Sequence, residues 1–501
     1  MGIIARQSFK AGIVSYSSVL IGILNQILIF PLCFTVEEYG AIQFVLQTSV
    51  FFTPFILFGM TTVLTRYYPK YNDSPTEKSL LFGVAITPIF LNTLIFLILF
   101  VLFGDIVEDK FSTRSKITSM SILVLFVIAT LQPWQVLSAN IAAIKGRIAI
   151  PSLLNHSIKL FLPVIAAMYF FDVFTYDQVI LSLLAYHVSI TIGHLMYTSR
   201  IEFIRPKFSL KNFRASLDIR SITSFALFSM FTGVGVNLTN QIDNVMITSI
   251  QGTYENGLYS WSLFCATAIA IPYTLIAAIS TPIISKLWKN RDMNKLDLLY
   301  KSSSSTLLVL SILLFTSFWL VIDDLFAIMP RGGEFMQAKS LVALLCFSKI
   351  LDLGTGLNSH ILSMSKSYRK LLWYLGLAAI INVGLNWVLI AHFGLVGCGI
   401  ATLVSISFFN YMKYTHLKRL YNLTPFTIGS VKIIVLAIVL YSIVFLVPKT
   451  ESHFVNLFIY SGSFALMFSF TIYRFKLSPD INSFIDRSYN SVQQHIKKIL
   501  R

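Results

Sequence analysis

Apolar stretches of about 20 residues or more recur along the whole chain, and they restrict its fold more than any other feature. A helix of that length crosses a hydrocarbon core of about 30 Å. Within lipid, backbone polar groups are satisfied only in helices or closed barrels, and barrel strands are short and alternate in polarity. The chain is 55% hydrophobic and 12% charged, whereas soluble domains carry about 25% charged residues. The sequence therefore predicts an all-α polytopic membrane protein.

We expect fourteen transmembrane helices with the N- and C-termini in the cytoplasm. Of the 39 lysines and arginines, this layout places 31 on the cytoplasmic side, 6 in outward loops and 2 within helices, as the positive-inside rule requires. Topology thus explains the net charge of +17, and no nucleic-acid partner is expected. The expected helices are at 12–35, 41–65, 79–104, 117–144, 150–171, 178–199, 222–250, 257–285, 302–322, 340–364, 371–391, 395–416, 429–447 and 454–473.

An internal repeat divides these helices into two sets. NQI at 25–27 returns at 240–242, and EEYG at 37–40 matches YENG at 254–257. Six expected helices separate equivalent points, so the two halves share one orientation, as in a parallel repeat about an axis along the membrane normal. The expected domains are an N-lobe at 1–199 with helices 1–6, a cytoplasmic interfacial linker at 200–220, a C-lobe at 221–418 with helices 7–12, helices 13 and 14 at 419–475, and a cytoplasmic tail at 476–501.

Several classes of protein are disfavoured by the motifs that the sequence lacks. It contains no GxxxxGK[ST] motif, no HExxH motif and no Cys/His cluster, so neither nucleotide hydrolysis nor a metal site is expected. No outward loop is long enough to resemble the catalytic loops of membrane polymerases, which makes a polytopic enzyme a weak alternative. Two lobes without an energy-converting domain favour a secondary transporter that rocks around a central cavity, with no organic cofactor.

Charged side chains at membrane depth are the first candidates for a site, because each is costly unless it faces water or a partner. Lys159 lies near the middle of the fifth helix, and Asn155 and His156 share its face. A cation without a nearby acid suits an anionic substrate such as a phosphate; the alternative is a structural lysine that pairs with another helix. Arg66 ends the second helix, where it could meet an anionic headgroup or serve only as an interfacial anchor.

Two further groups lie in the expected C-lobe. Asn240, Asp243 and Asn244 fall on one broad face of the seventh helix, which favours a lobe interface or a hydrated cavity. Asp243 is a candidate proton or cation site, or a counter-charge to the lysine of the fifth helix; the alternative is a polar strip that pairs helices. Lys349 and Asp352 are three residues apart on the tenth helix and are expected to neutralise each other, with ion handling as the alternative.

Four segments together resemble one known family. QIDNVMITSIQGTYENGLYSWSLF at 241–264 resembles the signature of polysaccharide-biosynthesis flippases of the multidrug/oligosaccharidyl-lipid/polysaccharide exporter superfamily. That signature has an Asp in helix 7 and Gly-Leu-Tyr at the start of helix 8. FGLVGCGIATLVS at 393–405, EYG at 38–40 and IKGR at 144–147 are similar to the same family, so the resemblance covers essentially the whole chain.

The resemblance implies two six-helix lobes with two additional helices, and transport by alternating access. Its members move undecaprenyl-pyrophosphate-linked oligosaccharides, such as O-antigen or other lipopolysaccharide units, capsule and exopolysaccharide units, from the inner to the outer leaflet of the bacterial plasma (inner) membrane. It also implies a basic cavity that binds pyrophosphate, coupling to H⁺ or Na⁺, and polysaccharide polymerases as partners. A multidrug cation antiporter and a peptidoglycan-precursor lipid flippase share this fold and remain alternatives, with a polytopic enzyme as the third.

Overall fold

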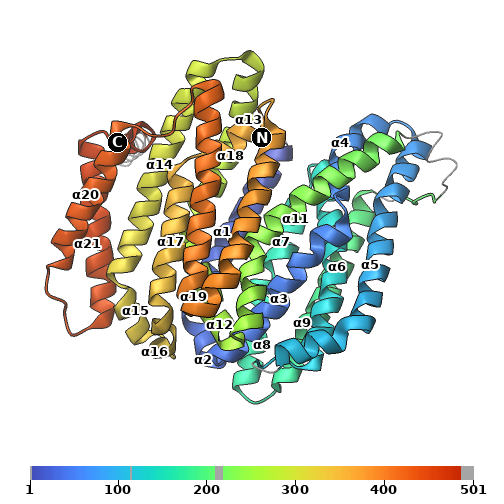
Figure 1. Cartoon of the computed structure of the whole chain (residues 1–501), viewed down its shortest axis with the longest axis horizontal. Coiled ribbons are helices and arrows are strands. Elements are labelled where there is room, and N and C mark those ends of the chain that lie inside the picture. Colours follow the sequence, from blue (N-terminus) through green and yellow to red (C-terminus); the bar gives the residue numbers. More distant parts are fainter. Residues whose placement is uncertain (1–2, 113–114, 203, 209–217, 484, 487–501) are drawn as a thin grey trace, which may run out of the picture. The chain divides into compact units, whose positions relative to one another are not determined.

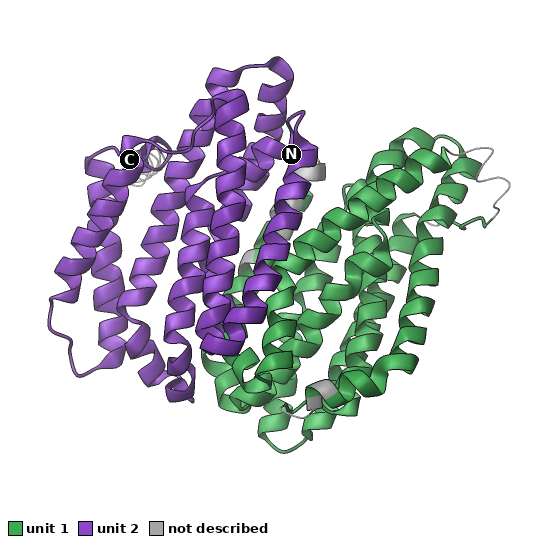
Figure 2. Cartoon of the chain, in the orientation of Figure 1, with its two compact units in different colours: residues 1–260 green, residues 261–501 purple. Residues whose placement is uncertain are grey.

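The computed structural model describes residues 3–112, 115–202, 204–208, 218–483 and 485–486 (Figure 1). Across these residues the regular elements are all helices, with no strand, which confirms the all-α prediction. Figure 2 shows the chain as two compact units, residues 1–260 and 261–501.

The first unit contains the helices of the N-terminal half. They are α1 (Ile3–Leu24), the π-helical turn η1 (Asn25–Ile29), α2 (Phe30–Cys33), α3 (Val36–Leu57), α4 (Met60–Tyr71), α5 (Pro75–Ser112), α6 (Ser119–Ile144), α7 (Ala149–His156), α8 (Ile158–Phe170), α9 (Tyr176–Ile201) and α11 (Ile219–Ile250).

The second unit begins within the next helix, α12 (Thr253–Ile269). Its other elements are α13 (Ile271–Asn290), α14 (Met293–Leu320), α15 (Ile322–Ile328), α16 (Gly332–Phe335), the 3₁₀ turn η2 (Met336–Ala338), α17 (Lys339–Gly354), α18 (Asn358–Ser363), α19 (Tyr368–Tyr421), α20 (Ile428–Phe445) and α21 (His453–Arg474).

Many of these helices are long and apolar enough to span a membrane. Eleven in the described residues meet that test, or twelve if α12 and α13, which bend by 45° between them, form one span. The expected helices at 371–391 and 395–416 are joined in the 54-residue α19, whose Gly394 has non-helical backbone angles (φ 58°, ψ −137°). The expected helix at 340–364 is interrupted, because α17 has only 16 residues. The total of fourteen therefore stays a prediction.

Threonine caps fix the starts of four of the spanning helices. Thr35, Thr118, Thr175 and Thr427 precede α3, α6, α9 and α20. Each hydroxyl accepts a hydrogen bond from the backbone N–H three residues on, and the side chain at that position bonds back to the cap. This capping box satisfies two N–H groups that the first turn of a helix leaves unpaired, so local sequence alone sets these helix ends.

The segments that match in the repeat lie against each other where α3 and α12 begin. A Cβ atom on Gly40 would stand 1.8 Å from the carbonyl oxygen of Thr253, and one on Gly257 would stand 2.2 Å from the carbonyl oxygen of Val36. Asn256 Nδ2 also donates to the Gly40 carbonyl over 2.9 Å. Each helix therefore presents a glycine to the other's backbone, and this reciprocal contact, the glycine crossing, leaves no room for a side chain.

The compact units do not coincide with the expected lobes. Helix α11, which the sequence assigns to the C-lobe, is counted with the first unit and packs on α3 and α4. Residues 209–217 of the expected interfacial linker and residues 487–501 of the expected tail lie outside the described residues. The lobe boundaries at 199 and 221 therefore remain a prediction.

Candidate functional site

The fifth expected helix is broken where its candidate residues lie. Ser157 separates α7 from α8, so Lys159 stands in the first turn of α8 rather than in the middle of a continuous helix. Its half-buried ammonium lies beside Gly22 of α1, 3.5 Å from where a Cβ on that glycine would be. Asn25 Nδ2 donates to the Lys159 carbonyl over 2.7 Å. Lys159 forms no ion pair with any described residue, which leaves its positive charge available for an anion.

The two predicted neighbours of Lys159 lie on α7, before the break, and have different partners. His156 lies towards α1, where its Nε2 is 3.3 Å from the Ser15 hydroxyl. Asn155 instead faces α9, and its Oδ1 is 3.0 Å from His194 Nε2. The expected shared face of Asn155, His156 and Lys159 is therefore wrong for Asn155, because an unbroken helix was assumed.

Asn155 lines a polar pocket of about 190 Å³ within the first unit. The pocket lies between α3, α6, α7, α8 and α9, and its polar walls come from amide, phenol and imidazole side chains. We name it the amide pocket; its lining residues are Leu46, Gln47, Val50, Gln132, Gln135, Leu154, Asn155, Ile158, Tyr186, His187 and Ile190.

The polar strip of the seventh helix is split between buried and exposed positions. Asp243 is buried and its Oδ2 accepts a hydrogen bond from Tyr259 over 3.0 Å. Asn244 is also buried, and its Oδ1 accepts from Ser260 over 3.1 Å. Asn240 is exposed. The two buried residues thus connect α11 to α12, as in the helix-pairing alternative, while an ion-coupling role of Asp243 stays a prediction.

Arg66 lies on α4 and is exposed. The carbon centre of its guanidinium is 4.4 Å from the centre of the Phe225 ring and 5.7 Å from that of Tyr67. Stacking of this kind anchors an arginine while its N–H groups stay in reach of a headgroup phosphate. The geometry therefore fits both the anchor and the headgroup alternatives.

Asp352 pairs with a different lysine from the expected one. Its Oδ1 is 3.9 Å from Lys413 Nζ and accepts a hydrogen bond from Asn410 Nδ2 over 2.9 Å. Lys349 forms no ion pair with any described residue. The expected Lys349–Asp352 pair is therefore wrong: three residues of spacing makes such a pair feasible, but the carboxylate is drawn towards α19.

The sequence does not predict Lys413 as a site residue. It lies near the end of the expected twelfth helix, among the lysines assigned to the cytoplasmic side. In the structure its side chain is only 1% exposed. The ammonium donates to Ser359 Oγ over 2.9 Å and lies 3.9 Å from the centre of the Phe409 ring. Only its distant partners on α17 and α18 reveal this depth, and no local signal in the sequence does.

An apolar groove of about 610 Å³ borders this polar cluster in the second unit. Thr355 belongs to both, because it lines the groove and donates a hydrogen bond to Asn410 Oδ1 over 2.7 Å. The rest of the lining is almost wholly aliphatic or aromatic, from α14, α17 and α20. It consists of Leu308, Ile312, Phe315, Thr316, Trp319, Phe347, Ile350, Leu351, Gly354, Phe426, Ser430, Ile434, Ala437, Ile438 and Tyr441.

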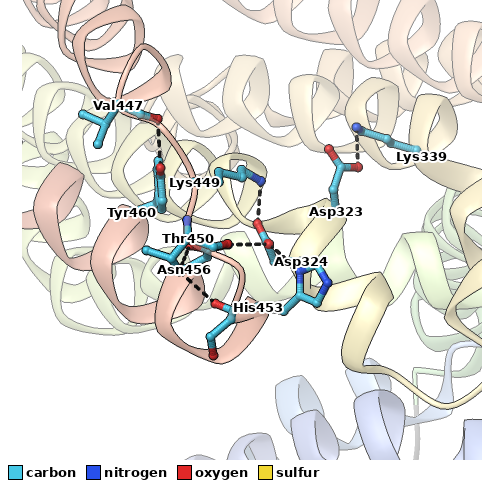
Figure 3. A network of polar contacts seen from close by, with 10 residues as sticks. Asp323, Asp324, Lys339, Val447, Lys449, Thr450, His453, Asn456 and Tyr460 are labelled. Carbon is cyan, nitrogen blue, oxygen red and sulfur yellow. Dashed lines mark hydrogen bonds and ion pairs between the residues drawn. The ribbon is translucent and has the colours of Figure 1, made fainter.

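A second polar cluster ties α15 to the hairpin of α20 and α21, as Figure 3 shows. The Asp324 carboxylate, 4% exposed, accepts hydrogen bonds from Lys449 Nζ, His453 Nδ1 and Asn456 Nδ2. Burial alone would raise the pKa of Asp324, but the hydrogen bonds from His453, Lys449 and Asn456 and the charge of Lys449 outweigh it and lower the pKa to about 2.

An Asp324→Asn variant is expected to unfold more easily by about 1–2 kcal/mol at pH 6, because Lys449 and His453 lose their charged acceptor while keeping access to water. Because the pKa of Asp324 is lowered in the folded protein, its carboxylate stabilises the fold at pH values above its ordinary pKa of 3.8. This stabilisation is lost as the pH falls towards about 2. Thermal unfolding in detergent should show that the difference in stability between the variant and wild type is smaller at pH 3 than at pH 6. A difference that is unchanged or larger at pH 3 would contradict this assignment.

The sequence matches a family profile and a membrane protein of known sequence. The profile of a family described as polysaccharide biosynthesis protein matches residues 9–288, more than half of the chain. An uncharacterized membrane protein of Methanocaldococcus jannaschii is 25% identical over 219 residues, covering 40% of this chain and 49% of the relative. The match therefore spans about half the length of that relative.

Solved transporters share the fold. The lipid II flippase MurJ, in an inward closed conformation, is similar with a TM-score of 0.73 and 15% identity, over 93% of this chain and 98% of that one. An inward-facing multidrug resistance MATE family transporter of the MOP superfamily has a TM-score of 0.62 and 11% identity, over 81% and 94%. Together with the family match, these likenesses show that the chain belongs to the polysaccharide biosynthesis protein family and has the fold of the MOP superfamily of membrane transporters.

Proposed function

We propose that this multi-pass membrane protein flips undecaprenyl-pyrophosphate-linked oligosaccharide from the inner to the outer leaflet by alternating access. The cargo would be a repeat unit of O-antigen, capsule or exopolysaccharide. Family membership supports a role in polysaccharide biosynthesis, and the fold of flippases and multidrug transporters supports transport without covalent chemistry.

Lys159 is the observation that carries this proposal. A lysine in a membrane segment is costly unless it meets water or an anion, and this one has no carboxylate partner among the described residues. A pyrophosphate would supply the missing negative charge through charge-assisted hydrogen bonds. Arg66 is proposed as an earlier contact for the headgroup, and His156 and Asn240 as polar contacts to the headgroup or sugar.

The apolar groove supports a lipid-linked cargo over a free sugar. Its walls are aliphatic and aromatic side chains, against which a polyprenyl chain could pack by van der Waals contact, whereas a free sugar would leave its hydroxyl groups unpaired there. Thr355 places the polar cluster of Asp352 and the buried Lys413 directly at its edge.

Ion coupling and location are parts of the same proposal. We assign coupling to H⁺ or Na⁺ to Asp243, and to Asp352 with the nearby Lys349. The carboxylate of Asp352 is 40% exposed, so the protein itself does not enclose it. The protein would lie in the bacterial plasma membrane with both termini in the cytoplasm, beside the polymerase that receives the flipped unit.

The lining of the two cavities favours this cargo over a cationic drug. Neither the amide pocket nor the apolar groove is lined by an aspartate or glutamate among the described residues, so neither lining offers a counter-charge to a cationic drug. A peptidoglycan-precursor flippase remains the alternative, because the fold likeness to the lipid II flippase covers 93% of the chain.

A Lys159→Ala variant is expected to flip lipid-linked oligosaccharide at least about tenfold more slowly than wild type, since a charge-assisted hydrogen bond contributes about 1.5–3 kcal/mol. The measurement uses proteoliposomes with a fluorescent undecaprenyl-pyrophosphate oligosaccharide in one leaflet, with and without a proton or sodium gradient. Parallel vesicles carry lipid II or a cationic dye.

Two matched variants control this experiment. Lys159→Arg keeps the charge and should retain most of the flipping rate, and Lys418→Ala removes an exposed lysine at the end of α19 and should have no effect. Flipping at the wild-type rate by Lys159→Ala would remove this residue from the site. Wild-type vesicles that move the dye or lipid II but not the oligosaccharide lipid would overturn the proposed function.

A further inference from the structure

The amide pocket lies near the middle of three helices that are long and apolar enough to span a membrane, and transporters commonly bind cargo near the midplane. Gln132 and Gln135 are near the middle of the 26-residue α6, and His187 is near the middle of the 26-residue α9. Gln47 is midway along the 22-residue α3. Polar side chains are costly to bury in the middle of a membrane helix, so their convergence from three helices on one cavity needs a cause.

The polar groups of this pocket are neutral hydrogen-bonding groups. They belong to amides, one phenol and one imidazole, and no Asp, Glu, Lys or Arg lines the pocket. Amides both donate and accept hydrogen bonds, which matches the hydroxyl groups of an uncharged sugar. Tyr186 adds a flat ring, stacked on Phe161 with 4.6 Å between ring centres, that suits the C–H face of a pyranose.

The pocket's side chains are held in place from behind. Gln135 Nε2 donates to the Thr191 hydroxyl over 2.9 Å and to the His187 carbonyl over 3.3 Å. The Tyr186 hydroxyl is 2.8 Å from that of Ser157. Such partners restrict rotamers before a ligand arrives, which lowers the entropy lost on binding.

Gln132 is held in the same way but keeps donors free. Its Oε1 accepts a hydrogen bond from the Thr53 hydroxyl over 2.9 Å, and its NH₂ group donates to none of the described residues. Gln132 lines the pocket, so this amide can donate two hydrogen bonds to a ligand there.

The size of the pocket limits what can enter. Pockets for drug-sized ligands measure about 300–1,000 Å³, and this one measures about 190 Å³. It therefore suits one ring of a larger molecule. Asn155 lines the pocket on one side of the break at Ser157, while Lys159, on the other side of the break, faces α1.

We propose that the amide pocket binds one uncharged sugar residue of the lipid-linked cargo, and that Gln132, Gln47 and Asn155 select it. Recognition is then divided between Lys159, which takes the pyrophosphate, and the amide pocket, which takes a sugar. This inference rests on the proposed function, because it concerns the cargo of the same transporter.

The test compares lipids that differ only in the sugar. Full-length protein in proteoliposomes is given bare undecaprenyl pyrophosphate, and the same lipid carrying one glucose, galactose or N-acetylglucosamine. Wild type is expected to move at least one sugar-bearing lipid about tenfold faster than the bare lipid, because several hydrogen bonds of about 1 kcal/mol each are gained. In a Gln132→Leu variant, the flipping rate of that sugar-bearing lipid is expected to fall to the rate of the bare lipid.

Two variants protect this test against misfolding. Gln47→Leu removes an amide whose described contact is a 3.5 Å approach to Gln43, so it disturbs the packing less and should also lose the preference. Lys159→Ala should slow all the lipids alike. Equal rates for bare and sugar-bearing lipids in wild type, or a preference that survives both glutamine substitutions, would overturn the amide-pocket proposal alone. Wild type that moves none of the lipids would overturn the proposed function and this inference with it.

Discussion

A Gly40→Ala variant is expected to lose about 3 kcal/mol of folding stability, because the added methyl group has no space at the glycine crossing. Its Cβ would stand 1.8 Å from the Thr253 carbonyl oxygen and 2.6 Å from the Gly257 nitrogen. Both atoms belong to backbone, so no rotamer change relieves the clash, and α3 must shift against α12. Thermal unfolding in detergent measures the loss.

The matched control is Gly376→Ala, where a Cβ would meet nothing within 4 Å. This helical position should gain about 1 kcal/mol, since alanine has the higher helix propensity. The same substitution thus has opposite signs at two glycines. Gly257→Ala should resemble Gly40→Ala, and the double variant should cost less than the sum, because both act on one contact. Gly40→Ala melting at or above the wild-type temperature would contradict the glycine crossing.

An Asp352→Asn variant is expected to lose about 3 kcal/mol of folding stability, much more than a Lys413→Met variant loses. The asymmetry follows from burial, since the lysine is 1% exposed and the aspartate 40% exposed. Removing the aspartate charge leaves a buried ammonium without a counter-charge, which costs about 3–5 kcal/mol. Removing the lysine leaves a carboxylate that is only partly enclosed and keeps its hydrogen bond from Asn410, which we expect to cost less than about 1 kcal/mol.

The double variant Asp352→Asn with Lys413→Met separates charge from packing. Methionine keeps most of the lysine volume, and asparagine can keep the hydrogen bond from Asn410, so the pair should recover most of the stability that Asp352→Asn loses. Unfolding midpoints of the four proteins complete the cycle. Equal losses from the two single variants would contradict the burial asymmetry, and additive losses in the double variant would show that the charges of Asp352 and Lys413 do not interact.

Most helices could be predicted from the sequence, because hydropathy and threonine caps are local signals. The cap at Thr35 and its Glu38 partner lie within four residues, so this helix start is a local signal. The helix breaks were harder. The π-helical turn at Asn25–Ile29 and the break at Ser157 have no proline at the breaking residue, and tertiary contacts such as Asn25 with the Lys159 carbonyl accompany them.

The candidate site was predictable only where one residue stood out alone. Lys159 is conspicuous as a cation in an apolar segment, and the structure likewise gives it no acidic partner among the described residues. Lys413 is not conspicuous, because two further basic residues follow within one or two turns and its partner Asp352 is distant in sequence. The amide pocket draws neutral side chains from separate helices, and neutral residues within helices are too common to be noticed singly.

The glycine crossing has a consequence for how such a chain could arise. Gly40 contacts the carbonyl of Thr253, and Gly257 contacts the carbonyl of Val36. In the repeat Gly40 corresponds to Gly257 and Val36 to Thr253, so the same contact is made twice. This is the geometry of an isologous interface, in which one surface patch is its own complement. A half-length polypeptide with a single such glycine could make the same contact with a second copy of itself. Gene duplication and fusion would then preserve a contact that already stabilised a homodimer.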